Sequence, residues 1–229
     1  LPQVVMVTSS NAREGKSFLT LNLGMTHALA GKRVLLLELD LRRPRQEVYS
    51  KLKTGSAGVS NFLQDAKMEA AQVIRNSGLH ERLDLISSGN IPTDPGELML
   101  SDRLRDLVEE LKGSYDFILI DAPPIGVVAD ALQLRDVAGT TLYVVRVGFT
   151  QTEQLQIIED VSQKGKLPNP YIVLNGLPMN KTSGYGYSYG YGTGSYGYGD
   201  NGYYGKKPRS LAANLAARIN GNFFSKFLS

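Results

Sequence analysis

The hydrophobic positions of this chain form short continuous runs that alternate with segments of helical periodicity. Continuous apolar runs of this length are typical of strands buried on both faces, and helices between such strands favour a mostly parallel β-sheet with helices on both faces. The sequence therefore predicts an α/β fold. The expected strands cover residues 4–7, 33–37, 83–87, 117–121, 140–147 and 171–174, and the expected helices residues 18–30, 58–64, 102–112 and 153–163.

A polar loop follows the first expected strand and ends in Gly15-Lys16-Ser17, directly before a helical segment. Strand, loop and helix in this order are the context of a P-loop. The loop amides and the helix start would present N–H dipoles to phosphate, Lys16 a positive charge and Ser17 a hydroxyl for Mg²⁺. Ser10 stands where the usual pattern has glycine, and a chance match in a turn is the disfavoured alternative. The predicted nucleotide-binding residues are Asn11, Ala12, Arg13, Glu14, Gly15, Lys16, Ser17 and Phe18.

Charged residues follow two other strands. Glu38, Asp40 and Arg42 alternate beyond the second strand, so they would leave it on one side. Asp121 ends a later apolar strand, in the Walker B pattern whose carboxylate holds Mg²⁺ directly or through water. Ligands of parallel sheets bind at the carboxyl ends of strands, so these residues would lie beside the P-loop. The alternative is a set of solvated charges at strand ends.

Two further polar features belong to loops. Asn175 ends the last strand, where its amide could pair with an adenine edge or cap a turn, and the sequence does not separate the two. Residues 89–95 are rich in turn-forming residues, and Pro95 suits the first turn of a helix.

The composition changes abruptly at Lys181. Residues 182–205 are almost entirely Gly, Tyr and Ser and lack aliphatic side chains, so this segment cannot bury a core and is expected to be a flexible tail. A linker without chemistry is the alternative. Residues 210–229 could form an amphipathic helix on a membrane surface or partner, or be disordered. The tail tyrosines are Tyr185, Tyr187, Tyr189, Tyr191, Tyr196, Tyr198, Tyr203 and Tyr204.

The bulk properties narrow the class of protein. A length of 229 residues suits one α/β domain with a tail, and the absence of cysteine excludes disulfides and thiolate metal sites. The net charge of +3 does not argue for nucleic acid as a partner. No apolar run reaches 18 residues. The chain begins at Leu1 rather than methionine, so we expect a fragment of a longer polypeptide.

Together these motifs resemble the bacterial tyrosine kinases, the cytoplasmic domains of capsular and exopolysaccharide co-polymerases. The resemblance covers residues 3–205 and implies a P-loop NTPase-like fold. It is carried by residues 9–17 (SSNAREGKS), 38–44 (ELDLRRP) and 117–124 (FILIDAPP), by residues 88–104 (SGNIPTDPGELMLSDRL) and by the tyrosine cluster.

The resemblance implies an ATP- and Mg²⁺-dependent tyrosine autokinase that modifies the tail of a neighbouring subunit. Ser17, Asp40 and Asp121 would organise Mg²⁺, and Glu38 or Asp40 would accept the tyrosine proton. The family motif usually reads DxDxR, so Glu38 departs from it by one methylene. The implied catalytic residues are Lys16, Glu38, Asp40, Arg42 and Asp121.

It also implies an organisation and partners. The expected parts are a kinase domain at 1–180, an autophosphorylated tail at 181–207 and a short C-terminal segment at 208–229. The partners would be further copies of the chain, the transmembrane part of its own longer polypeptide, a cognate tyrosine phosphatase and polysaccharide export machinery. The location would be the cytoplasmic side of the bacterial inner membrane, and the family's arginine-rich helix would precede residue 1.

Two other functions are alternatives to a tyrosine kinase. Partition and septum-positioning ATPases share the P-loop, but their signature lysine would stand at Asn11, and they lack a tyrosine-rich tail. A scaffold that binds ATP but has lost catalysis through Glu38 is the other alternative.

Overall fold

The computed structural model describes residues 3–42, 57–126 and 129–177, and these contain one seven-stranded sheet with the order β3-β4-β2-β5-β1-β6-β7. All pairs of neighbouring strands are parallel except β3 and β4. The predicted mostly parallel sheet is confirmed. The strands are β1 (Gln3–Ser9), β2 (Val34–Glu38), β3 (Arg75–Asn76), β4 (Leu83–Ile86), β5 (Phe117–Asp121), β6 (Thr140–Arg146) and β7 (Pro170–Asn175).

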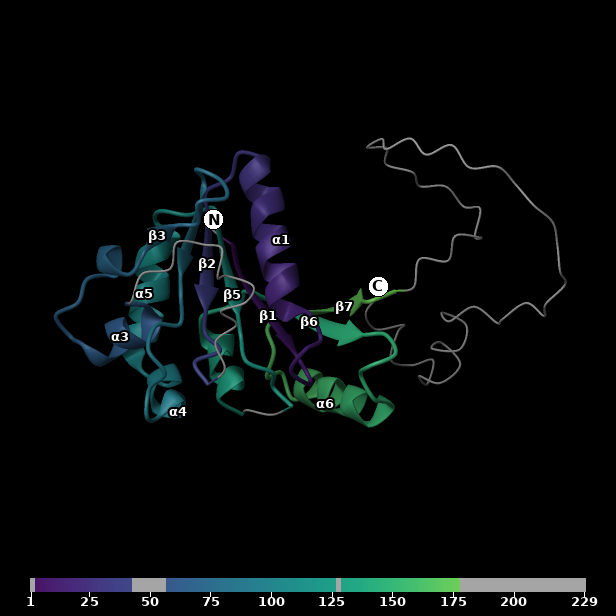
Figure 1. Cartoon of the computed structure of the whole chain (residues 1–229). Helices are drawn as coiled ribbons and strands as arrows, with labels where there is room; N and C mark the ends of the chain where they lie inside the picture. The colour runs from purple at the N-terminus through teal and green to yellow at the C-terminus, as the bar shows by residue number, and fades with distance from the viewer. Residues whose placement is uncertain (1–2, 43–56, 127–128, 178–229) are drawn as a thin grey trace, which may run out of the picture. The chain divides into compact units, whose positions relative to one another are not determined.

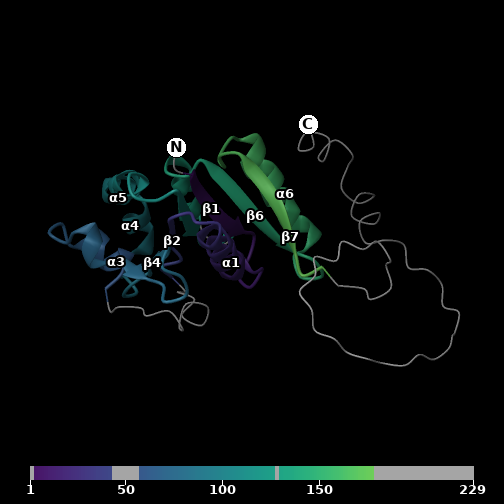
Figure 2. The same ribbon diagram turned by 90° about the horizontal axis from the view of Figure 1, so that it is seen from above.

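Helices cover both faces of this sheet, as predicted. The helix α1 lies against one face, and α5 and α6 lie against the other (Figures 1 and 2). Within the described ranges, no helix is both long enough and apolar enough to cross a membrane. The helices are α1 (Lys16–Leu29), α3 (Val59–Gln64), α4 (Pro95–Met99), α5 (Asp102–Lys112) and α6 (Thr152–Gln163), with two 3₁₀ helices, η1 (Ala70–Gln72) and η2 (Ala129–Asp136).

The main core lies between α1 and the central strands. Val5, Leu36 and Leu119 come from three adjacent strands and belong to one buried cluster with Ala28 of the helix. A Cβ atom on Gly24 would lie 2.7 Å from Cδ2 of Leu36, so the glycine lets α1 approach the sheet closely. This packing holds the start of α1, and therefore the P-loop, in the middle of the sheet.

Some of the shorter elements of the structure were not predicted from the sequence pattern. The two-residue strand β3 and the three-residue η1 are too short to show a period, and the sequence pattern did not predict the eight-residue η2 either. The predicted helix start at Pro95 is confirmed, because Pro95 begins α4 and Oδ1 of Asp94 accepts the Glu97 amide at 3.1 Å. The tail and the C-terminal segment lie outside the described residues, so the predicted domain boundaries stay predictions.

Arg103 of α5 holds the C-terminal end of α3. Its Nε donates to the Phe62 carbonyl at 2.8 Å, and Nη2 donates to the carbonyls of Asp65 at 2.9 Å and Met68 at 2.6 Å. The guanidinium carbon lies 4.0 Å from the centroid of the Phe62 ring. The last carbonyls of a helix have no partner within it, and the planar guanidinium supplies several donors at once.

Arg103→Ala is therefore expected to lower the free energy of unfolding by about 1–3 kcal/mol, because charge-assisted hydrogen bonds and a cation–π contact are lost together. Urea unfolding monitored by circular dichroism measures the change. Arg105→Ala is the matched control, since Arg105 forms an exposed ion pair with Asp102, and ion pairs of this kind contribute little stability. Equal stability of the Arg103 variant and the wild-type chain would contradict the proposed role.

Candidate active site

The P-loop joins the central strand β1 to α1. Positive φ angles at Arg13 (68°) and Gly15 (104°) fold the loop back before the helix begins at Lys16. The first helical hydrogen bond runs from the Leu19 amide to the Gly15 carbonyl at 2.9 Å. The amides of the first turn have no acceptor within the helix, and the positive end of the helix dipole lies with them. This end of α1 is suited to bind phosphate.

Lys16 folds over the loop that precedes it. Its Nζ donates to Oγ of Ser9 at 3.0 Å and to the Asn11 carbonyl at 3.4 Å, and the residue is 6% exposed. Ser17, also buried, follows it in the first turn. An ammonium group, a hydroxyl and the helix-end amides thus gather at one loop, and this donor set fits the phosphates of a nucleotide.

Two carboxylates lie on adjacent strands next to this loop. Glu38 of β2 and Asp121 of β5 are partners in the parallel register, so their side chains point to the same face of the sheet. Both residues are buried, at 4% and 2% exposed. Oε2 of Glu38 accepts the Ser88 amide at 3.0 Å, which links the carboxylate to the loop after β4.

Beyond β2, buried and more exposed side chains alternate over residues 39–42, as predicted, but these residues do not continue the strand. β2 ends at Glu38, and a hydrogen bond of 2.9 Å from the Leu41 amide to the Leu39 carbonyl closes a tight turn. Leu39 and Leu41 are buried, whereas Asp40 is half-buried and Arg42 is exposed. The structure describes no group of three or more His, Asp or Glu side chains placed to hold a metal ion.

Asn175 contacts the P-loop directly. Its Nδ2 donates to the Glu14 carbonyl at 2.8 Å, and its Oδ1 accepts the Gly176 amide at 2.8 Å. The side chain thus caps its own turn and also supports the loop. Contact with an adenine edge stays a prediction.

Tyr143 explains how serine replaces the first P-loop glycine. Oγ of Ser10 lies 2.9 Å from the phenol oxygen of Tyr143, and both residues are fully buried. Burial raises the pKa of Tyr143 far above its usual value, so the phenol stays protonated and hydrogen-bonded. No local motif marks Tyr143, because its partner is 133 positions away in the sequence.

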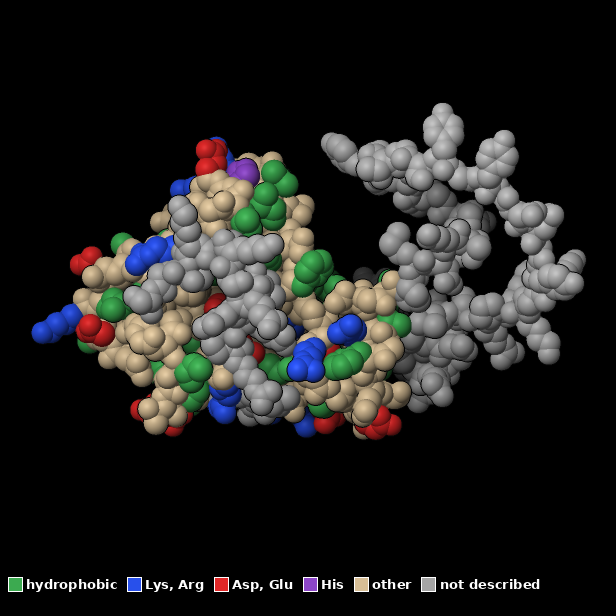
Figure 3. All heavy atoms as spheres, in the orientation of Figure 1, with side chains coloured by type: hydrophobic (Ala, Val, Ile, Leu, Met, Phe, Trp, Pro, Cys, Tyr) green, Lys and Arg blue, Asp and Glu red, His purple; other side chains and the backbone are tan. Residues whose placement is uncertain are grey.

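Phe18 lies at the surface next to the P-loop. It is 64% exposed in the first turn of α1, a helix along which Figure 3 shows hydrophobic side chains at the surface.

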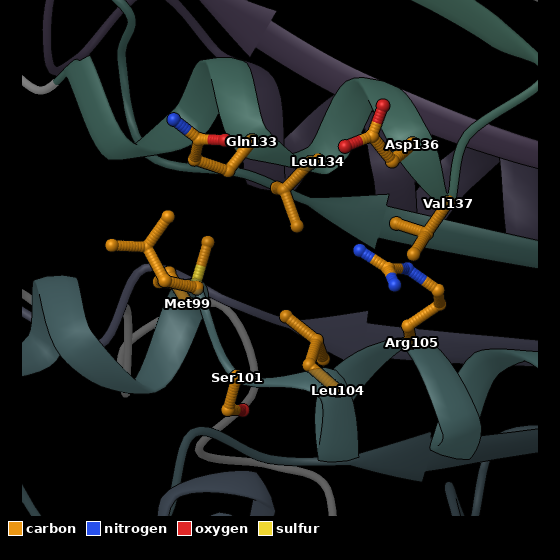
Figure 4. Close-up of a pocket in the computed structure, with 9 residues that line it drawn as sticks. Met99, Ser101, Leu104, Arg105, Gln133, Leu134, Asp136 and Val137 are labelled. Atoms are coloured by element: carbon orange, nitrogen blue, oxygen red, sulfur yellow. The ribbon is translucent and has the colours of Figure 1, made fainter.

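A pocket between α4, α5 and η2 has walls formed by Met99, Leu104 and Leu134 (Figure 4). None of the predicted site residues lines this pocket, so it does not belong to the candidate active site.

Comparisons with known proteins agree with this geometry. A family model described as "AAA domain" matches residues 3–148. The tyrosine-protein kinase YwqD of Bacillus subtilis (strain 168) is 36% identical over 203 residues, which are 89% of this chain and 78% of YwqD. A putative tyrosine-protein kinase in the cps region of Klebsiella pneumoniae is 32% identical over 80% of this chain, which spans only 25% of that protein.

A solved structure gives the same result. The kinase domain of the Escherichia coli tyrosine kinase ETK superposes with a TM-score of 0.72 at 28% identity, covering 83% of this chain and 73% of that domain. The chain belongs to the bacterial tyrosine-protein kinases, with an ATP-binding P-loop domain. The predicted resemblance and the tyrosine kinase activity that it implies are confirmed, and the partition-type alternative is not better supported.

Gly15→Ala is expected to abolish nucleotide binding. A Cβ atom at this position would lie 2.1 Å from Nδ2 of Asn175, and the φ of 104° is strained for any side chain, so the loop must change shape. Calorimetric titration with Mg²⁺–ADP tests this. Gly31→Ala serves as the control, because Gly31 also has a positive φ but nothing lies near its Cβ position. Wild-type affinity in the Gly15 variant would contradict the expectation.

Proposed function

We propose that the chain transfers the γ-phosphoryl group of ATP to tyrosines of the Gly/Tyr-rich segment in a neighbouring copy. The observation that carries the proposal is the position of the P-loop after β1 and of Lys16 at the start of α1, next to the Glu38–Asp121 pair on β2 and β5. Phosphoryl transfer depends mainly on positioning and charge neutralisation, and this sheet edge offers both a cationic loop and carboxylates.

In this proposal each part of the site has a separate task. The P-loop amides and Lys16 bind the phosphates, while Ser17, Asp40 and Asp121 bind Mg²⁺, directly or through water. Mg²⁺ would neutralise the charge of the phosphates during transfer. Because Mg²⁺ retains several waters in proteins, a site with few protein ligands is adequate for it.

Glu38 or Asp40 would accept the proton of the tyrosine hydroxyl. As the tyrosine oxygen bonds to the γ-phosphorus, the bond from phosphorus to the β–γ bridging oxygen breaks, ADP leaves and the phenol proton passes to Glu38 or Asp40. A phenol with a pKa near 10 needs a positioned acceptor. The hydrogen bond from the Ser88 amide orients the Glu38 carboxylate. Arg42 would stabilise negative charge on the transferred group.

The acceptors and partners follow from the relatives and from the sequence. The acceptors would be Tyr185, Tyr187, Tyr189, Tyr191, Tyr196, Tyr198, Tyr203 and Tyr204, docked as tails in the sites of a homo-oligomer. The matched region is only 25% of the Klebsiella relative, and this coverage supports a longer polypeptide here as well. The transmembrane part of that polypeptide would be a further partner of the kinase domain. The cps-region name of this relative supports a role in capsular polysaccharide export. In this proposal the chain acts at the cytoplasmic side of the inner membrane, and a cognate phosphatase reverses the modification.

Lys16→Met tests the proposal. The variant should lose tyrosine phosphorylation in the presence of Mg²⁺–ATP, because the cation that faces the β- and γ-phosphates is gone. Mass spectrometry of the purified chain locates the phosphotyrosines. Lys32→Met, at an exposed lysine in the turn after α1, is the matched control and should be modified like the wild-type chain. Phosphotyrosine at the wild-type rate in the Lys16 variant would overturn the proposal.

Glu38→Gln separates the two candidate bases. The amide can still accept the Ser88 N–H, so the local structure is kept while the proton acceptor is lost. If Glu38 is the base, the rate of autophosphorylation should fall by roughly 10²–10⁴-fold. The affinity for ATP should change much less. An unchanged rate, together with a large loss in Asp40→Asn, would assign the role to Asp40 instead.

A further inference from the structure

The acidic side chain of Glu14 is fully buried within the phosphate-binding loop. Oε2 accepts the amide of Asn11 at 2.7 Å, across the same loop. Oε1 is hydrogen-bonded to Oγ1 of Thr150, a residue 136 positions away in the turn between β6 and α6. A buried carboxylate is tolerated only when it is hydrogen-bonded, and both of its oxygens are used here.

The turn that carries Thr150 is itself fixed to the loop at a second point. The Arg146 amide donates to Oγ1 of Thr150 at 2.9 Å, which closes the turn. Nη1 of Arg146 donates to the Arg13 carbonyl at 2.9 Å, and the guanidinium carbon lies 5.3 Å from the centroid of the Phe149 ring. The P-loop is thus joined to this turn by the Glu14 side chain of the loop and by the Arg146 side chain at the start of the turn.

These bonds act on the part of the loop with the least regular backbone. Arg13, with a φ of 68°, immediately precedes Glu14, and Gly15, with a φ of 104°, immediately follows it. A non-glycine residue at positive φ costs free energy and persists only where the surrounding contacts hold it. The hydrogen bonds of Glu14, together with the bond from Arg146 to the Arg13 carbonyl, supply such contacts.

We propose that the Glu14 carboxylate is a positioning residue, which holds the P-loop in its nucleotide-receiving shape by joining the Asn11 amide to the Thr150 hydroxyl. The inference rests on the proposed nucleotide site and adds a role for the β6–α6 turn, which is remote from that site in the sequence. Glu14 acts through the loop backbone and takes no part in the transfer. Variation at Thr150 therefore changes nucleotide affinity through Glu14.

Calorimetric titration of the full chain with Mg²⁺–ADP tests this inference. Glu14→Ala and Thr150→Val should each weaken binding by about tenfold, since each removes a hydrogen bond to a charged group that orders the loop. The double variant should bind no more weakly than Glu14→Ala alone, because both changes break the same link. Glu14→Gln should stay within about threefold of the wild-type chain, since its oxygen can accept from Asn11 and its N–H can donate to Thr150.

Glu153→Ala is the matched control and should bind like the wild-type chain, because Glu153 is exposed in the first turn of α6. Unfolding temperatures without nucleotide show whether each variant is folded, and Thr150→Val decides the matter should Glu14→Ala not fold. Wild-type affinity in either single variant, or additive losses in the double variant, would overturn the inference. Failure of the wild-type chain to bind Mg²⁺–ADP would instead overturn the proposed function on which the inference rests.

Discussion

The parallel pairing of β5 with both β1 and β2 is the constraint on which the site depends. Asp121 is in register with Val7 of β1 and with Glu38 of β2, so three strand ends reach the same edge of the sheet. Side chains alternate between the two faces of a strand, so a slip of one residue would turn Asp121 to the other face. The apolar residues of these strands are buried on both faces, and their burial opposes such a slip.

Features that depend on residues close together in the sequence could be predicted from it, whereas features that depend on residues far apart could not. The central strands and most of the helices were predicted because apolar runs and helical periodicity are local. Lys16, Glu38 and Asp121 were singled out because each lies at a strand end or helix start that such patterns reveal. The contacts of Tyr143 and Thr150 with the P-loop were not predicted, because each partner is more than 130 positions away and no local pattern marks it.

The burial of two carboxylates at this end of the sheet has an electrostatic cost that the surrounding structure must offset. Two carboxylates buried on adjacent strands repel each other in a medium of low dielectric constant, and hydrogen bonds or cations must compensate. The Ser88 amide gives Glu38 one such bond, and the longer side chain of glutamate reaches it from the end of β2. This bond joins the Glu38 carboxylate at the end of β2 to the loop after β4, which precedes α4.

The two halves of the site are consequently held in different ways. The carboxylates of β2 and β5 stand on strands whose backbones are paired on both sides, so the sheet itself sets their positions. The P-loop has no such ladder, and its backbone carries positive φ angles that the sheet cannot impose. Side chains from outside the loop bond to it instead: Tyr143 to Ser10, Thr150 to Glu14, and Asn175 to the Glu14 carbonyl. These contacts come from β6, the β6–α6 turn and β7, so these elements support the nucleotide loop, whereas β2 and β5 position the acidic groups next to it.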